Sequence, residues 1–292
     1  MLSVIVSFFS PCDYALPRRH FADAVRRLVD AGMCVIVTQA VCDGRAPVPV
    51  PSGVAQYAEY HGAEPMFLKE NLWNLGAAMA DPQSHLAFLD ADVSLPSWWW
   101  QRTEDTLEHA DVCQPFAKCR WMDRSGTVFR EMRPSALAIE RGKAPWHHRY
   151  HPGFGIAIRR DAYDRLGGIY ERFPSGGGDL AFWLAMSTHP ETETIAKHKG
   201  NGNGLNTHAP TYVAYRANAL SLNLRVAAVP GVTATHPWHG DRENRLYTTR
   251  ETFFPRCADG EPAVARRADG LLKYTMPAPN AIDYFAVRKE DG

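Results

Sequence analysis

The N-terminal segment, residues 1–38, constrains the fold more than any other part of this chain. Leu2–Phe9 and Met33–Thr38 are apolar runs rich in β-branched residues, which is typical of strands buried on both faces of a sheet. Between them, Pro17–Ala31 has the spacing of an amphipathic helix. The apolar stripe of that helix consists of Phe21, Ala24, Val25 and Leu28. The sequence therefore predicts a β-α-β unit, which crosses over right-handedly into a parallel sheet.

Strands and helices continue to alternate along the rest of the chain. Strands are predicted at 57–67, 85–89, 110–116, 153–158 and 226–229, and helices at 68–80, 96–109, 160–166, 180–186 and 220–224. Residues 43–56 and 189–210 are expected to be loops. Trp98–Trp100 cannot all share one helix face, so at least one is expected near the surface. This order predicts an α/β fold, a mostly parallel Rossmann-like sheet with helices on both faces.

Composition excludes several classes of protein. The 292 residues are 45% hydrophobic and 22% charged, which is typical of a globular protein with a sizeable core. No apolar run approaches the roughly 18 residues of a membrane span, and Met1–Phe9 lacks the basic start of a signal peptide, so we expect cytoplasmic residence. The six cysteines include no CxxC pair, which argues against a zinc knuckle or a disulfide framework. A net charge of +0 argues against bulk electrostatic binding of nucleic acid.

Two carboxylates follow the apolar run His85–Leu89. Asp90 and Asp92 are placed where the chain leaves the predicted strand, at its carboxyl end, and open α/β sheets bind ligands at that edge. Alternate residues of extended backbone point to opposite sides, so one acid can face a ribose or sugar and the other a divalent cation. The alternative is a solvated turn that caps the following helix.

Residues 118–151 show no regular pattern of apolar residues. The segment has eight basic and three acidic residues, together with His147, His148 and His151. We expect a long irregular insertion, which is functional or mobile, and the alternative is a solvated basic loop.

The order of motifs resembles that of the GT-A glycosyltransferases, and within them the metal-dependent, inverting family-two-like enzymes. The motifs, besides Asp90 and Asp92, are the β-α-β unit, Lys69 with Asn74, His151–Phe154, the Gly-rich Ser175–Asp179, and the pair His236 and His239. Trp238–Gly240, Asn244-Arg245, Tyr247 and the tail Tyr284–Asp291 also resemble a group of such proteins often found in bacteriophage genomes. A phage-encoded protein would act in the host cytoplasm.

The resemblance implies a metal ion and a nucleotide-sugar donor, with a UDP-sugar favoured. Asp92, His239 and His236 are the implied ligands of Mn²⁺ or Mg²⁺, and histidine favours Mn²⁺. The alternative for His236 is a capping or core histidine. Asp179 is the implied general base, with a helix N-cap as the alternative. Gly178 stands where the family more often has an acid, which by the resemblance would recognise donor hydroxyls.

The remaining site residues follow the family pattern. The nucleotide-sugar is expected to contact Ser7, Phe8, Gln39, Lys69, Asn74, Asp90, Arg242 and Arg245. The acceptor is expected to contact Trp146, His151, Gly177 and Gly178.

The expected organisation is one GT-A domain over 1–292, with a nucleotide-binding half at 1–95, an acceptor half at 96–240 and a C-terminal lid or tail at 241–292. The expected activity is transfer of a hexosyl or pentosyl group, with a 5-hydroxymethylated pyrimidine in phage DNA as one acceptor. The alternatives are a glycan, lipid or protein acceptor, or a degenerate module that binds nucleotide-sugars without catalysis.

Overall fold

A seven-stranded sheet forms the centre of the computed structural model, which describes residues 1–145, 149–192, 208–246, 249–255 and 261–291. Its strand order is β10-β5-β9-β4-β1-β2-β3. The strands are β1 Leu2–Phe9, β2 Cys34–Cys42, β3 Gln56–Ala63, β4 His85–Leu89, β5 Val112–Gln114, β9 Gly155–Ile158 and β10 Val226–Ala228. Strand β9 runs antiparallel to β4 and β5, and the other pairs are parallel. The predicted mostly parallel sheet is therefore confirmed.

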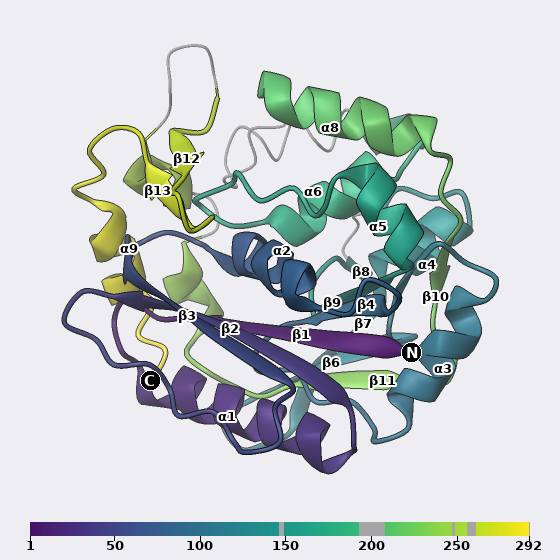
Figure 1. Cartoon of the computed structure of the whole chain (residues 1–292), viewed down its shortest axis with the longest axis horizontal. Helices are drawn as coiled ribbons and strands as arrows, with labels where there is room; N and C mark the ends of the chain where they lie inside the picture. The colour runs from purple at the N-terminus through teal and green to yellow at the C-terminus, as the bar shows by residue number, and fades with distance from the viewer. Residues whose placement is uncertain (146–148, 193–207, 247–248, 256–260, 292) are drawn as a thin grey trace.

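Helices cover both faces of this sheet, as predicted (Figure 1). They are α1 Ala15–Asp30, α2 Lys69–Met79, α3 Trp99–Leu107, α5 Arg160–Leu166, α6 Gly178–Ala185 and α8 Pro210–Ser221. The α1 stripe that includes Phe21 and Val25 packs with one set of alternate β1 side chains, such as Val4. Helix α2 packs Trp73 with the other set, which includes Ile5. Because successive strand residues face opposite sides, β1 is buried from both directions.

The contact between α2 and β1 depends on Gly76. A Cβ at this position would lie 2.6 Å from Ile5 Cγ2, too close for two carbon atoms. Gly76→Ala in an exposed helix would stabilise by about 1 kcal/mol, because alanine has the better helix propensity. In this protein we expect Gly76→Ala to lower the free energy of unfolding by about 1–3 kcal/mol, because the added Cβ overpacks the contact with β1. Urea unfolding of the two proteins measures this difference, and a variant more stable than wild type would contradict the packing.

The prediction of an irregular insertion at 118–151 is wrong. The segment forms β6 Lys118–Met122, β7 Val128–Pro134, α4 Ser135–Glu140 and β8 Tyr150–His151. A second sheet has the order β11-β6-β7-β8, in which β11 is Thr233–His236. Cys119 faces the core while Arg120 pairs with Glu131 across the strands at 2.8 Å. The strands of this hairpin were not predicted, because charged residues on its solvent face interrupt the apolar run expected of a buried strand.

Other boundaries differ from the prediction in part. Helix α8 begins at Pro210, well before the predicted 220–224, and most of the predicted loop at 189–210 lies outside the described residues. Trp98 is 45% exposed and Trp99 is buried, which confirms the expectation for the three tryptophans. Within the described ranges, no helix combines the length and apolar character needed to cross a bilayer.

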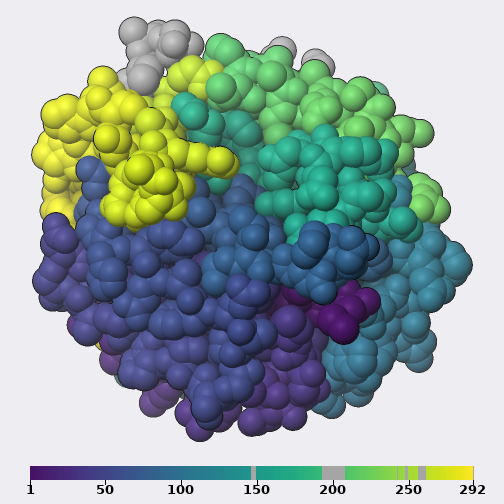
Figure 2. Space-filling view, in the orientation of Figure 1, coloured from purple at the N-terminus to yellow at the C-terminus, as the bar shows by residue number. Residues whose placement is uncertain are grey.

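The C-terminal segment lies against the N-terminal half of the chain (Figure 2). Its described residues are 241–246, 249–255 and 261–291. Its elements are η1 Arg242–Arg245, η2 Arg250–Phe253, β12 Val264–Arg266, β13 Leu272–Tyr274 and α9 Ala281–Val287. Phe285 packs on Phe9 at the end of β1, and Asp291 accepts hydrogen bonds from the Ala15 and Leu16 amides at the start of α1. The last residues are thereby fixed beside the carboxyl end of β1.

Candidate active site

A cavity of about 720 Å³ opens at the carboxyl ends of β1 and β4. Its volume is within the range of about 300–1,000 Å³ that is usual for ligand-binding pockets. Its wall combines residues from the seven-stranded sheet, the four-stranded sheet and the C-terminal segment. The predicted site residues that line it are Ser7, Phe8, Lys69, Asp90, Asp92, His151, Gly177, Asp179, His236, His239 and Arg245.

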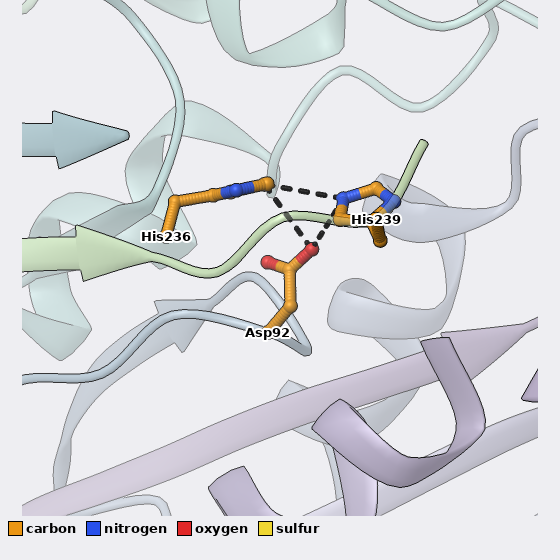
Figure 3. A group of neighbouring side chains, drawn as sticks. All are labelled: Asp92, His236 and His239. Atoms are coloured by element: carbon orange, nitrogen blue, oxygen red, sulfur yellow. Dashed lines mark hydrogen bonds and ion pairs between the residues drawn. The ribbon is translucent and has the colours of Figure 1, made fainter. Parts of the chain in front are cut away.

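Asp92 and two histidines form one compact cluster in this wall (Figure 3). Asp92 lies in the turn after β4, His236 ends β11, and His239 follows in the next loop. The Asp92 carboxylate oxygen Oδ2 lies 3.2 Å from His236 Nε2 and 3.0 Å from His239 Nε2. The two Nε2 atoms are 3.3 Å apart. The antiparallel bridge between Ser94 and Thr235 joins the two chain segments and holds them in register.

These three side chains fit a divalent cation. Ligand atoms held about 2.1 Å from an octahedral ion lie about 3 Å from their neighbours, close to the separations in this cluster. Within the described part of the chain, this is the one group of three or more acidic, histidine or cysteine side chains close enough to share an ion. Burial would raise the pKa of Asp92, but His236 and His239 hold that pKa well below its usual range. A charged oxygen and two imidazole nitrogens are ligands that divalent transition metal ions accept.

His239 has further partners in the C-terminal segment. Glu290 Oε1 lies 3.5 Å from His239 Nδ1, and Arg245 Nη2 lies 3.1 Å from His239 Nε2. Burial lowers the pKa of His239, yet its contacts with Asp92 and Glu290 raise it above the ordinary value. A carboxylate behind the distal nitrogen of a histidine is the usual support of a metal ligand, since it fixes the ring and its tautomer. Glu290 was not among the predicted site residues, because an acid within a charged tail gives no signal.

A second cluster surrounds Lys69 at the start of α2. Lys69 Nζ lies 3.0 Å from Asp90 Oδ1 and 3.6 Å from Asp179 Oδ2. Burial would raise the pKa of Asp179, but the Lys69 ammonium and other contacts lower it below the ordinary value. Asp179 therefore stays ionised at neutral pH. Asp90 and Asp92 face different partners, Asp90 the lysine and Asp92 the histidines.

The segment His151–Phe154 packs against the acids of the Lys69 cluster. A Cβ at Gly153 would lie 2.7 Å from Asp179 Oδ2 and 2.9 Å from His151 Nε2, so only glycine leaves room for both. Phe154 has a φ of 80°, and its N–H donates to Asp90 Oδ2 at 3.0 Å. This strained backbone is therefore held by the acid that follows β4. Burial lowers the pKa of His151 to about 3, so its imidazole is neutral.

Several predicted residues do not line the cavity. The Gln39 amide hydrogen-bonds the backbone of Val48 in both directions, and the Asn74 side chain donates to the Ile169 carbonyl at 2.7 Å. Both amides therefore position loops. Gly178 is the first residue of α6, behind the lining residue Gly177. Trp146 and the side chain of Arg242 lie outside the described part of the chain.

Neither protein-family models nor curated proteins match this chain. Solved structures give weak matches over 63% of the chain. TarS from S. aureus matches with 13% identity over 54% of its chain and a TM-score of 0.38. TarS in complex with UDP-GlcNAc matches with 15% identity over 52% of its chain and a TM-score of 0.37. A mutant Drosophila β-1,4-galactosyltransferase 7, in complex with manganese, UDP-Gal and xylobiose, matches with 13% identity over 60% of its chain and a TM-score of 0.33. The chain thus spans about half the length of the solved structures that it matches.

Proposed function

We propose that this protein is a metal-dependent, inverting GT-A glycosyltransferase, which moves a hexosyl or pentosyl group from a nucleotide-sugar to an acceptor hydroxyl. The observation that carries the proposal is the pairing of two clusters in one cavity: Asp92, His236 and His239, suited to a cation, and the ionised Asp179 beside Lys69. The proposed organisation is a single domain, with nucleotide half 1–95, acceptor half 96–240 and C-terminal lid 241–292.

Asp92, His236 and His239 would hold Mn²⁺ or Mg²⁺, which when bound neutralises the charge of the departing diphosphate. Ser7 and Phe8, at the end of β1, would contact the nucleobase of the donor, with a UDP-sugar as the first candidate. Arg245 lies beside His239 and would contact the diphosphate, because its guanidinium is a strong phosphate partner.

Asp179 is the proposed general base. Asp179 lines the cavity; its Oδ1 accepts a hydrogen bond from the Leu180 amide at 2.7 Å, and its Oδ2 lies 3.6 Å from Lys69 Nζ. The acceptor oxygen forms a bond to the anomeric carbon while the bond from that carbon to the diphosphate oxygen breaks. The electron pair leaves with the nucleoside diphosphate, and the hydroxyl proton passes to Asp179.

The proposed acceptor side is the β6–β7 hairpin together with Trp238. Phe129 is 58% exposed, Arg130 lies over the Trp121 ring at 5.8 Å, and Arg124 lies over the Trp238 ring at 5.1 Å. Aromatic rings stack on exposed bases, and arginines bind phosphates. These features favour a 5-hydroxymethylated pyrimidine in DNA, as for a phage enzyme, over a glycan, lipid or protein acceptor.

Release of nucleoside diphosphate from a panel of nucleotide-sugars with Mn²⁺ tests this proposal. The panel is assayed with DNA containing 5-hydroxymethylated pyrimidine, with unmodified DNA, and without acceptor. We expect release that requires both the metal and the modified base. Release that is indifferent to DNA would move the acceptor to glycans, lipids or proteins. No release from any donor would favour a degenerate binding module over an enzyme.

Glu290→Gln is expected to weaken Mn²⁺ binding by about 10–100-fold, because the neutral amide supports His239 less well than a carboxylate. Isothermal titration with Mn²⁺ measures the change. Asp283→Asn, an exposed acid on the neighbouring α9, is the matched control and should bind like wild type. Unchanged Mn²⁺ affinity in Glu290→Gln would show that the C-terminal segment does not support the metal site.

A further inference from the structure

Glu70, the second residue of α2, is a buried acid whose role the proposed reaction leaves open. Glu70 is among the residues that line the cavity, yet only 4% of its side chain is exposed. Among the described residues, its Oε1 has no hydrogen-bond partner, and Lys69 Nζ lies 3.7 Å away. A buried carboxyl oxygen without a hydrogen bond is costly, so such a group is expected to have a partner that binds from outside.

The position of Glu70 explains the glycine before the proposed base. A Cβ at Gly178 would lie 2.4 Å from Glu70 Cδ and 2.6 Å from its Oε1. Gly176 and Gly177 have φ values of 82° and 92°, whereas Gly178 is the first helical residue of α6, where other residues are allowed. Glycine at 178 is therefore required by the Glu70 carboxyl and not by the backbone. That carboxyl occupies the space that a side chain at 178 would fill.

The surroundings of Glu70 select the kind of group that it can bind. Three carboxyl groups, those of Glu70, Asp90 and Asp179, surround the single ammonium of Lys69. An excess of negative charge repels a phosphate but accepts hydrogen bonds from neutral hydroxyls. If Asp179 is the base and the Asp92 cluster holds the metal, the transferred sugar lies between them. Its hydroxyls are then the groups within reach of Glu70.

We propose that Glu70 binds a hydroxyl of the transferred sugar, supplying from helix α2 the carboxyl that the Gly-rich loop lacks at position 178. This inference rests on the proposed function and adds a residue that distinguishes among donor sugars. Burial raises the pKa of the Glu70 carboxyl to about 7, so near neutral pH it both donates and accepts hydrogen bonds. A sugar hydroxyl, itself both a donor and an acceptor, can pair with the carboxyl in either form.

Isothermal titration with Mn²⁺ present tests the contact, with UDP, UDP-glucose, UDP-galactose and UDP-GlcNAc as probes. For Glu70→Ala we expect UDP affinity within about twofold of wild type, and a loss of about 10–100-fold for the sugar that wild type prefers. Equal losses for UDP and for the UDP-sugar, or no loss for either, would overturn the proposal. If wild type binds none of the probes, the proposed function fails in its UDP-sugar form, and Glu70 loses this role with it.

A double variant that moves the carboxyl from position 70 to position 178 distinguishes sugar binding by Glu70 from a structural role. In Glu70→Ala/Gly178→Asp, one bond of about 1.5 Å beyond the Cβ at 178 brings the new carboxyl into the vacated space. We expect this double variant to recover at least tenfold in sugar-dependent affinity over Glu70→Ala. Gly178→Asp alone should lose affinity, because its side chain collides with Glu70. A double variant no better than Glu70→Ala would count against the proposal.

The Tm of a Glu70 variant gives a second test. A purely structural role for Glu70 predicts a change in Tm of the opposite sign. Because the pKa of Glu70 is raised to about 7 in the folded protein, the folded state binds a proton there that the unfolded state has released. Stability is therefore lost as pH rises from about 4.5 to 7, the interval between the two pKa values. Glu70→Gln should raise Tm by about 2 °C or more at pH 8, with a smaller rise at pH 5. A lower Tm at pH 8, combined with equal losses of UDP and UDP-sugar affinity in Glu70→Ala, would make Glu70 a structural partner of Lys69 and contradict the proposal.

Discussion

Asp179→Asn is expected to lower sugar transfer by about 10²–10⁴-fold while binding of the donor with Mn²⁺ survives. The amide keeps the shape of the side chain and its hydrogen bond from the Leu180 amide, but it cannot take up the proton of the acceptor hydroxyl. Lys69 lies 3.6 Å from the carboxylate, so the variant also leaves that ammonium with one fewer counter-charge. Initial rates of nucleoside diphosphate release and titration with the donor measure the two quantities separately.

The matched control for this variant is Asp105→Asn, an exposed acid on α3 that should transfer sugar like wild type. Thermal unfolding checks that both variants are folded at the assay temperature. Transfer by Asp179→Asn within tenfold of wild type would remove Asp179 from the role of base. The aspartate would then be an N-terminal residue of α6, whose charge stabilises the helix start.

Asp92→Asn is expected to have the other large effect, a loss of at least about 10³-fold in kcat/KM. A bound cation contributes several kcal/mol to stabilising the charge that develops on the leaving group, and each 1.36 kcal/mol is about a factor of ten in rate. Asp92 supplies the charged oxygen of the cluster, which the amide cannot replace. Titration with Mn²⁺ should show the loss of binding directly, whether or not the acceptor has been identified.

Histidine variants provide the control for the metal site. His239→Ala should lose Mn²⁺ binding like Asp92→Asn, whereas the exposed His61→Ala, on β3, should bind normally. His236→Ala tests the alternative assignment of that residue as a core histidine, since its ring stacks on Phe154 at 5.3 Å. A His236→Ala protein that binds Mn²⁺ like wild type would leave His236 with a packing role only. Normal binding by Asp92→Asn would refute the metal site itself.

The sequence was sufficient for those parts of the fold that are buried in a regular pattern. Leu2–Phe9 and His85–Leu89 were predicted with the boundaries that the structure has, because unbroken apolar runs have few other interpretations. The β6–β7 hairpin was missed, because residues such as Arg120 and Glu131 pair on its solvent face and interrupt the pattern. Whether such a segment forms a strand depends on the neighbouring strands with which it pairs, and the pairing cannot be read from a single sequence.

The residues of the candidate site also fall into two groups, those that local sequence could predict and those that it could not. Asp90 and Asp92 could be placed from local sequence, because they directly follow a buried strand. Glu70 could not, since an acid in the first turn of a helix is ordinary, and only the packing of α2 on α6 brings it against Gly178. Glu290 reaches His239 through the docking of the C-terminal segment, a contact between residues far apart in the chain. Neither contact has a local signature.

The most direct test of a metal-dependent nucleotide-sugar site is calorimetric titration of wild type and Asp92→Asn with UDP, with GDP, CDP and dTDP as alternatives, each with Mn²⁺ and with EDTA. We predict that one nucleoside diphosphate binds wild type only when Mn²⁺ is present, and that the variant does not bind it under either condition. Binding that is the same with EDTA and unaffected by Asp92→Asn, or no binding of any of the four, would contradict the account.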